Sequence, residues 1–182
     1  SGALNFVGAT IAQANQDQGF LRLDHNFSSG DRLFFRYGIS QQHVPELQLN
    51  PNFSIVQDIR DQNAVVSHTH LFGAATLSEL RLGYNRANNV FLGPDRSAFS
   101  PLTDLGISGV AEDPRLKGVP SISMPGILGI AEHFLVPLTQ IDWTYTLAEN
   151  ITHNFGGHSL KMGLDLRKSR LNRFFQQSNR GG

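Results

Sequence analysis

The chain has 182 residues, a formal net charge of zero and no cysteine. The neutral balance gives no electrostatic basis for binding nucleic acid, and the lack of cysteine excludes disulfides, thiolate nucleophiles and thiolate metal ligands. No run of about eighteen apolar residues occurs, so the sequence contains no membrane-spanning helix. A membrane-spanning strand stays open, because it needs only about ten residues, half of them apolar.

The clearest pattern lies at residues 20–40, where two segments of alternating apolar and polar residues flank the loop Ser28-Ser29-Gly30. A three-residue loop that ends in glycine is typical of a bulged β-hairpin. It sets Leu23 opposite Phe35 and brings the apolar side chains of both strands onto one face. A two-residue loop would place leucines opposite arginines, because a one-residue slip moves every side chain to the other face. We predict a hairpin at about 17–42.

Two further hairpins, at about 62–90 and 139–175, are predicted from the same alternation. Prolines interrupt the segments between the hairpins, and proline lacks the N–H group that a central strand needs. We therefore expect long loops at about 43–61 and 92–138. Both are longer than an ordinary hairpin loop of about two to five residues.

The hairpin at about 139–175 has a two-residue turn at Gly156-Gly157, which sets Leu147 opposite Leu166. The apolar faces of its two strands then match. Glu149 departs from the pattern, because it falls on the apolar face opposite Leu164. The sequence offers no explanation for this residue beyond a bulge or a position near an edge.

Short turns at one end of the strands and long loops at the other are typical of transmembrane β-barrels. The predicted strands have about nine or more residues, whereas strands of soluble sheets most often have about five or six. Aromatic residues lie near the strand ends, as they do in the interface girdles of such barrels: Phe27, Tyr37, Phe72, Phe91, Trp143, Tyr145 and Phe155. We predict an all-β fold, an antiparallel up-and-down meander of about six long strands that forms a partial transmembrane β-barrel with two long loops.

One face of each strand would contact lipid and the other would line the lumen. The lipid-facing candidates are Leu21, Leu23, Leu33, Phe35, Tyr37, Leu80, Leu82, Tyr84, Trp143, Tyr145, Leu147, Met162, Leu164 and Leu166. The lumen-lining candidates are Arg22, Asp24, Arg36, Glu79, Arg81, Lys161, Asp165 and Arg167. These charged residues either line a solute path or hold a plug, or they pair with one another and only solvate the wall. We favour mutual pairing, because exposed ion pairs are common and individually weak.

His68 and His70 are two residues apart on one predicted strand and so share a face. Imidazole is a common metal ligand, so the two can contribute to a metal site. We favour the simpler interpretation that both are polar residues of the wall that face the lumen, because no third ligand lies nearby in the sequence. Glu132 and His133 adjoin in a predicted loop, with no nucleophile or orienting partner indicated. No common catalytic or nucleotide-binding motif occurs, so we predict neither an enzyme nor a cofactor.

The sequence resembles TonB-dependent outer-membrane receptors of the Oar-like class. The matching residues are 19–37 (GFLRLDHNFSSGDRLFFRY), 67–70 (SHTH) with 78–86 (SELRLGYNR), and 157–167 (GHSLKMGLDLR). The resemblance implies a location in the bacterial outer membrane and a barrel of about twenty-two strands around a plug domain. It also implies import that is driven by a TonB complex.

With no signal peptide at its start and no closing strand at its end, the chain is expected to be an internal fragment of one barrel domain, residues 1–182. The resemblance implies that its partners are outer-membrane lipid, the plug domain, the remaining barrel strands, the TonB complex and an unidentified solute. The expected function is to form part of the barrel wall of a receptor that imports a bulky solute, such as a carbohydrate or a peptide-like nutrient.

Two alternatives stay open. A soluble ligand-binding β-barrel or β-sandwich would bury the apolar residues Leu21, Leu33, Phe35, Leu82, Trp143 and Leu164 in a packed interior. A passive porin or adhesin barrel would share every strand feature and would differ only in lacking a plug.

Overall fold

Six long strands form one antiparallel sheet in the computed structural model, which describes residues 9, 11–48, 50–96, 98–109, 113, 117–125 and 127–175. The order across the sheet is β1-β2-β3-β4-β7-β8, so neighbouring strands follow one another along the chain and the predicted meander is confirmed. The strands are β1 (Asn15–Ser28), β2 (Asp31–Glu46), β3 (Ile55–Phe72), β4 (Thr76–Leu92), β7 (Leu138–Phe155) and β8 (His158–Phe175).

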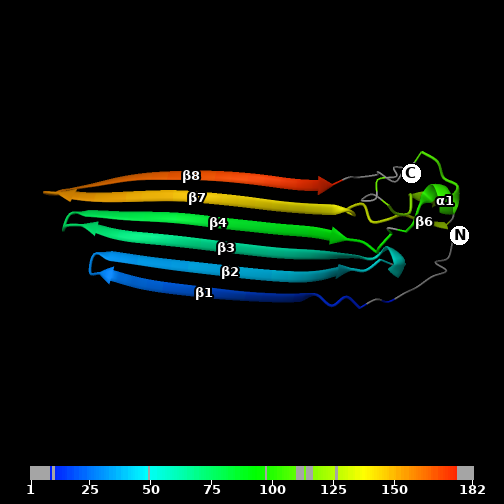
Figure 1. Ribbon diagram of the computed structural model, residues 1–182, viewed down its shortest axis with the longest axis horizontal. Helices are drawn as coiled ribbons and strands as arrows, with labels where there is room; N and C mark the ends of the chain where they lie inside the picture. Colours follow the sequence, from blue (N-terminus) through cyan, green and yellow to red (C-terminus); the bar gives the residue numbers. More distant parts are fainter. Residues whose placement is uncertain are drawn as a thin grey trace.

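The short turns all lie at one end of the sheet and the longer connections at the other (Figure 1). A 3-10 helix at Pro51–Phe53 lies between β2 and β3. The connection from β4 to β7 contains the short helix α1 (Pro101–Leu105) and a small hairpin of β5 (Ile122–Met124) and β6 (Ile127–Ile130). Among the described residues, no helix has the length and hydrophobicity to cross a membrane.

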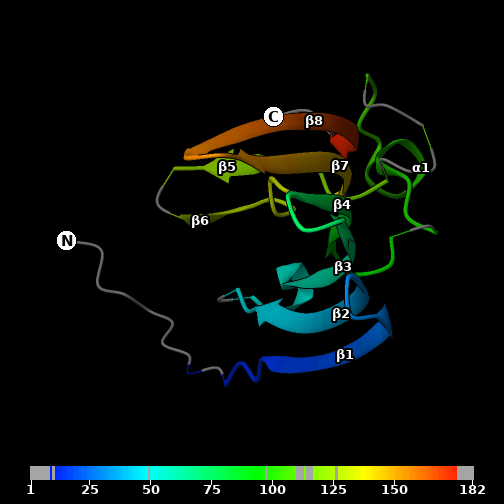
Figure 2. The same cartoon turned by 90° about the vertical axis from the view of Figure 1, so that its left-hand side faces the viewer.

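The sheet is curved and open. In Figure 2 the six strands are seen nearly end-on and follow an arc, with β1 and β8 at its two ends. Within the described residues β1 pairs only with β2, and β8 pairs only with β7. Each of these edge strands therefore leaves one side of its backbone without a strand partner.

The three hairpins are displaced from one another by a constant step. Asp31, the first residue of β2, pairs with His70, and the turn after β3 comes two residues further on, at the pair of Phe72 and Thr76. Thr76 pairs with His153, and the turn after β7 again comes two residues further on, at Phe155. Each hairpin contributes two strands, so the sheet shears by one residue per strand.

This shear is the one that a closed barrel requires. With a rise of about 3.3 Å per residue and about 4.8 Å between strands, one residue per strand corresponds to a strand tilt of about 35°. Strands of barrels tilt by about 35–45° from the barrel axis. When the strands tilt by this angle, the three short turns lie at the same level along the axis.

The first two hairpins extend beyond their predicted bounds of about 17–42 and 62–90, the third matches its predicted span of about 139–175, and the first long loop is shorter than predicted. Its predicted span of about 43–61 is wrong, because β2 continues to Glu46 and β3 already begins at Ile55. Pro45 lies inside β2 and pairs with Val56. The ladder between β1 and β2 ends at His43, so at Pro45 strand β2 has β3 on one side only, and a proline is tolerated there. The connection predicted at about 92–138 matches the segment between β4 and β7.

The first turn also differs in detail from the prediction. Leu23 pairs with Phe35 as predicted, but Ser28 pairs with Asp31, and the register shifts between Asn26 and Ser28. The bulge therefore falls within β1 and the turn has two residues. An extra residue in one strand has the same effect on the register as a longer loop, which is why the predicted faces still match.

The sheet has almost no packed core. The buried hydrophobic residues of the described part of the chain are Ile55, Val136 and Leu138, all at the loop end of the sheet. Leu21, Leu82 and Leu164 are each about half exposed, at 51%, 44% and 52%. A soluble module with these residues in a dry interior does not fit this arrangement.

The two glycines of the turn between β7 and β8 differ in backbone conformation, and this difference can be tested by substitution. Gly156 has a φ of 57°, in the left-handed region, and Gly157 is not in this region and has no neighbouring atom within 4 Å of an added Cβ. We expect Gly156→Ala to lower the free energy of unfolding of the protein by about 1–2 kcal/mol. The control Gly157→Ala should change it by less than about 0.5 kcal/mol. Urea unfolding would measure both free energies, and equal losses would contradict the assigned turn.

Candidate functional site

The strand register sorts the predicted residues onto two faces. Cross-strand pairs run from Leu23 to Phe35, Val66 and Leu82, and on to Leu147 and Leu166 in β7 and β8. By this register all fourteen predicted lipid-facing residues share one side of the sheet, which we call the apolar face. All eight predicted lumen-lining residues share the other side, the polar face.

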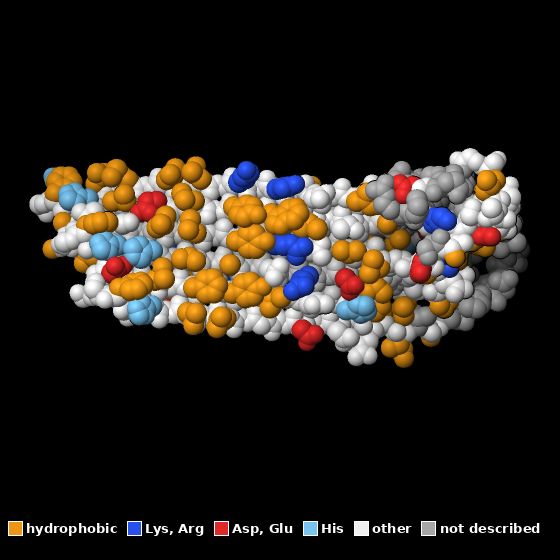
Figure 3. All heavy atoms as spheres, viewed as in Figure 1, with side chains coloured by type: hydrophobic (Ala, Val, Ile, Leu, Met, Phe, Trp, Pro, Cys, Tyr) orange, Lys and Arg blue, Asp and Glu red, His pale blue; other side chains and the backbone are white. Residues whose placement is uncertain are grey.

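The apolar face has polar groups at both ends of a broad hydrophobic band (Figure 3). Histidines and acidic side chains gather toward the turn end, and a row of lysine and arginine side chains crosses the sheet on the other side of the band. We call the first group the histidine belt (His25, His70, His153 and His158) and the second the basic belt (Arg60, Arg86, Lys168 and Arg170).

The histidine belt repeats one local motif. His25, His70 and His153 each precede a phenylalanine by two residues, just before a short turn. The rings of His25 and Phe27 are 4.4 Å apart, and those of His70 and Phe72 are 4.3 Å apart, both edge to face. The phenylalanines are among the predicted strand-end aromatics, whereas the histidines that pair with them were not predicted, although the repeated His-X-Phe pattern is visible in the sequence.

The residues of the basic belt also lie at similar distances along their strands from the short turns. Its four residues lie 11 to 13 residues from the turn of their own hairpin. The guanidinium of Arg170 lies 5.7 Å from the centre of the Trp143 ring, and the rings of Tyr84 and Tyr145 are 5.4 Å apart. The belt therefore adjoins a cluster of aromatic side chains at the edge of the hydrophobic band.

The two belts are separated by a fixed length of strand. Ten residues separate His70 from Arg60 in β3, and ten separate His158 from Lys168 in β8. At about 3.3 Å per residue and a tilt of about 35°, ten residues rise by about 27 Å along the barrel axis. The apolar band of outer-membrane barrels is about 25 Å tall, so the hydrophobic band of this sheet has the height of a membrane span.

On the polar face, one predicted ion pair forms. The guanidinium of Arg22 lies 2.7 Å from the carboxylate of Asp24, and both side chains are about half exposed. Within the described residues no ion pair joins the other six candidates, Arg36, Glu79, Arg81, Lys161, Asp165 and Arg167. Mutual pairing therefore explains only part of the charge on this face.

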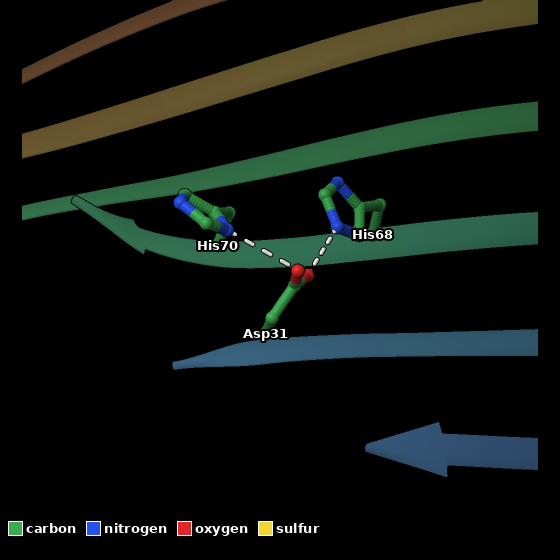
Figure 4. A group of neighbouring side chains, drawn as sticks. All are labelled: Asp31, His68 and His70. Carbon is green, nitrogen blue, oxygen red and sulfur yellow. Dashed lines mark hydrogen bonds and ion pairs between the residues drawn. The ribbon is translucent and has the colours of Figure 1, made fainter. Parts of the chain in front are cut away.

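The predicted lumen-facing orientation of His68 and His70 is wrong, because the pairing of β3 with β2 and β4 sets both on the apolar face. Near the turn end of this face, the structure adds a third polar side chain to the two histidines. Asp31 of β2 lies directly opposite His70 of β3, and His68 is on the same face of β3. The Oδ1 atom of Asp31 is 2.5 Å from Nε2 of His68 and 3.6 Å from Nδ1 of His70. Figure 4 shows both rings leaning from β3 toward the carboxylate on β2. We call these three residues the Asp-His-His cluster.

Asp31 cannot be found from the alternation along β3, because the residue belongs to a different hairpin. It precedes His68 by 37 positions, and the pairing of β2 with β3 across the intervening loop sets the contact. The register of each hairpin was predictable from its turn, whereas the register between hairpins was not. No third candidate ligand lies near the two histidines in the sequence, and strand pairing brings Asp31 to them.

Glu132 and His133, the adjacent acid and histidine of the long connection, belong to separate ion pairs. Glu132 accepts from Nε of Arg96 at 2.9 Å, and Nε2 of His133 lies 3.1 Å from the carboxylate of Glu46. Arg96 also donates to the backbone oxygen of Asn52. These contacts tie the two loop regions to each other and to the end of β2.

Glu149 lies on the apolar face, without a bulge, opposite Leu80 and Leu164. The Oγ atom of Ser78, on the neighbouring strand, donates to its Oε1 atom at 2.6 Å. Burying a polar group is tolerated when it is hydrogen-bonded. Ser78 therefore accounts for the residue that departed from the sequence pattern.

A curved, sheared, two-faced sheet with a hydrophobic band of membrane height is the wall of a membrane-spanning β-barrel. The family comparison agrees, because a model described as "Outer membrane beta barrel domain" matches residues 1–182. The chain belongs to this outer-membrane β-barrel family. Comparison with curated proteins and with solved structures gave no significant match.

The contact between Ser78 and Glu149 can be tested by a double-mutant comparison. Ser78→Ala leaves the carboxylate without its donor and should lower the free energy of unfolding by about 1–3 kcal/mol. In the double variant Ser78→Ala/Glu149→Leu both polar partners are gone, so stability should return to the wild-type value or exceed it. Unfolding of the complete protein in lipid vesicles gives the values. A double variant less stable than Ser78→Ala would contradict the assigned contact.

Proposed function

We propose that this chain forms part of the barrel wall of a TonB-dependent receptor that imports a bulky solute across the bacterial outer membrane. The main support for a membrane-spanning wall is the hydrophobic band between the histidine belt and the basic belt. Family membership supports a barrel of the outer membrane. The finer assignment to TonB-dependent import rests on the resemblance of residues 19–37, 67–70 with 78–86, and 157–167 to Oar-like receptors.

In this proposal the apolar face contacts lipid and the polar face lines the lumen. Leucines and aromatic residues of the apolar face lie between the histidine belt and the basic belt, about one hydrocarbon thickness apart. Lysines and arginines are costly at the bilayer midplane and tolerated near the interfaces. The position of Arg60, Arg86, Lys168 and Arg170 outside the band therefore supports lipid contact.

The open edges support a larger barrel. Backbone groups in lipid must all be hydrogen-bonded, so barrels close without free edges. The strands β1 and β8 each need a further partner strand, and the proposed receptor supplies these from the rest of its barrel. A shear of one residue per strand suits a barrel of many strands as well as a small one.

The charged residues of the polar face favour a lumen that contains a plug domain or a solute over a lumen that contains only water. Charged side chains that do not pair with one another, such as Arg36, Arg81 and Lys161, are available to a plug domain or a solute. Charges on a lumen surface tune which solutes pass. The tied loops at the other end, joined through Arg96 and Glu132, offer a preformed surface for the first contact with a solute. No catalytic step is part of the proposed role.

A passive porin or adhesin is the remaining alternative, because its wall would have the same strands. The resemblance favours a receptor, and electrical measurement separates the two. A plugged receptor should give no stable open conductance when the complete protein is inserted into a planar lipid bilayer. A steady open channel without any energy source would identify a porin and overturn the proposal.

Transport itself gives the second arm of this test. A bacterium that expresses the complete protein should gain growth on oligosaccharide or peptide mixtures only when its TonB complex is functional. Growth that persists after TonB is removed would contradict energised import. Absence of growth on every mixture, together with an open conductance, would favour the passive alternative.

The orientation of the two faces can be tested by single cysteines in the complete protein, since the chain has none of its own. Cysteines at Leu33, Phe35 and Leu164 should react with probes dissolved in the lipid phase, and cysteines at Arg36 and Lys161 with water-soluble probes. Matched pairs such as Phe35 and Arg36 are adjacent in the chain and differ only in face. The reverse labelling pattern would overturn the proposed orientation.

A further inference from the structure

We propose that the Asp-His-His cluster, Asp31, His68 and His70, binds a divalent transition-metal ion, with Zn²⁺ as the best fit. The bound ion would join β2 to β3 at the turn end of the sheet. The proposal is independent of TonB-dependent import, because it rests only on these three side chains and the strand pairing that brings them together.

The three ligand atoms are already close enough to share one ion. Oδ1 of Asp31, Nε2 of His68 and Nδ1 of His70 all lie within 4.8 Å of one another. Bonds of about 2.0–2.2 Å in a tetrahedral zinc site put neighbouring ligand atoms about 3.3 Å apart. Small side-chain rotations accomplish this, since the two distances from Asp31 are 2.5 Å and 3.6 Å.

The backbone holds these side chains in position. Asp31 and His70 are cross-strand partners, and His68 is two residues along the same face, so the ladder between β2 and β3 fixes all three Cβ atoms. The His70 ring packs edge to face on Phe72, with ring centres 4.3 Å apart. A metal ion would therefore bind to a largely formed site.

The donor set selects the kind of metal. Two imidazoles and one carboxylate suit Zn²⁺ and its neighbours in the first transition row, whereas Mg²⁺ and Ca²⁺ prefer oxygen ligands alone. The side chains of Asp31, His68 and His70 are 28%, 38% and 35% exposed. Protein therefore does not enclose the cluster, and its position at the histidine belt, at the edge of the hydrophobic band, lets an ion enter from the membrane surface and keep a water molecule as its fourth ligand.

Other polar residues of this face lack such an arrangement. Ser78 bonds to Glu149, and Thr76 bonds to His153, each as a single pair. In the described part of the chain, no other group of three histidine or carboxylate side chains comes as close together. His25 and His153 lie at the same level of the histidine belt and belong to no such cluster among the described residues, so they supply matched controls.

The test uses the complete membrane protein in detergent micelles, stripped with EDTA and titrated with ZnCl₂ in a calorimeter. We expect one Zn²⁺ per chain and a rise in the unfolding temperature on binding. Co²⁺ in place of Zn²⁺ should give the visible absorption of a four-coordinate site. Mg²⁺ at the same concentration should give neither effect.

Variants then locate the site. His68→Gln, His70→Gln and Asp31→Asn keep polar side chains and should each weaken binding by more than the roughly 10- to 100-fold known for outer-shell partners. The controls His25→Gln and His153→Gln should bind like the wild type. Each variant is used only if its unfolding transition in the absence of metal shows that it is folded. Absence of saturable Zn²⁺ binding to the folded wild type, or equal affinity in His68→Gln, would overturn the proposal.

Discussion

Pairing of every backbone group is the constraint on which the rest of the structure depends. A strand in lipid has no water to satisfy its N–H and C=O groups, so it must be paired along its whole length. The six strands meet this requirement for every internal ladder, with pairs that run from the turns to the loop end. The shear, the tilt and the two faces all follow from this pairing, because the register of each ladder decides which side chains share a level.

Much of this fold was predictable because the information is local. Alternation assigns a face to each residue, and a short turn fixes the register of its own hairpin, so the pairs Leu23–Phe35 and Leu147–Leu166 were correct. The predicted strand bounds were wrong where they depend on pairing between residues far apart in the sequence. The sequence predicts a loop at Pro45, whereas β2 continues through this residue because β1 has already ended and leaves one side of β2 unpaired.

Local alternation also gives part of the candidate site, and pairing between hairpins gives the rest. His68 and His70 share a face by simple alternation, and the sequence shows this directly. Asp31 joins them only through the ladder between two hairpins, and no turn geometry sets that ladder. The contact of Glu149 was unpredictable for the same reason, because its partner Ser78 also lies in another hairpin. Local patterns thus give the faces, and tertiary pairing gives the contacts between polar residues on them.

The constant step between hairpins has a consequence for how such a wall can change in evolution. Copying a whole hairpin would add two strands and two residues of offset, and every new side chain would keep its depth and its side. Inserting one residue into a strand would instead turn the remainder of that strand inside out, unless a bulge such as the one at Phe27 absorbed it. Growth by duplication of entire hairpins is therefore the path of least disturbance for this architecture.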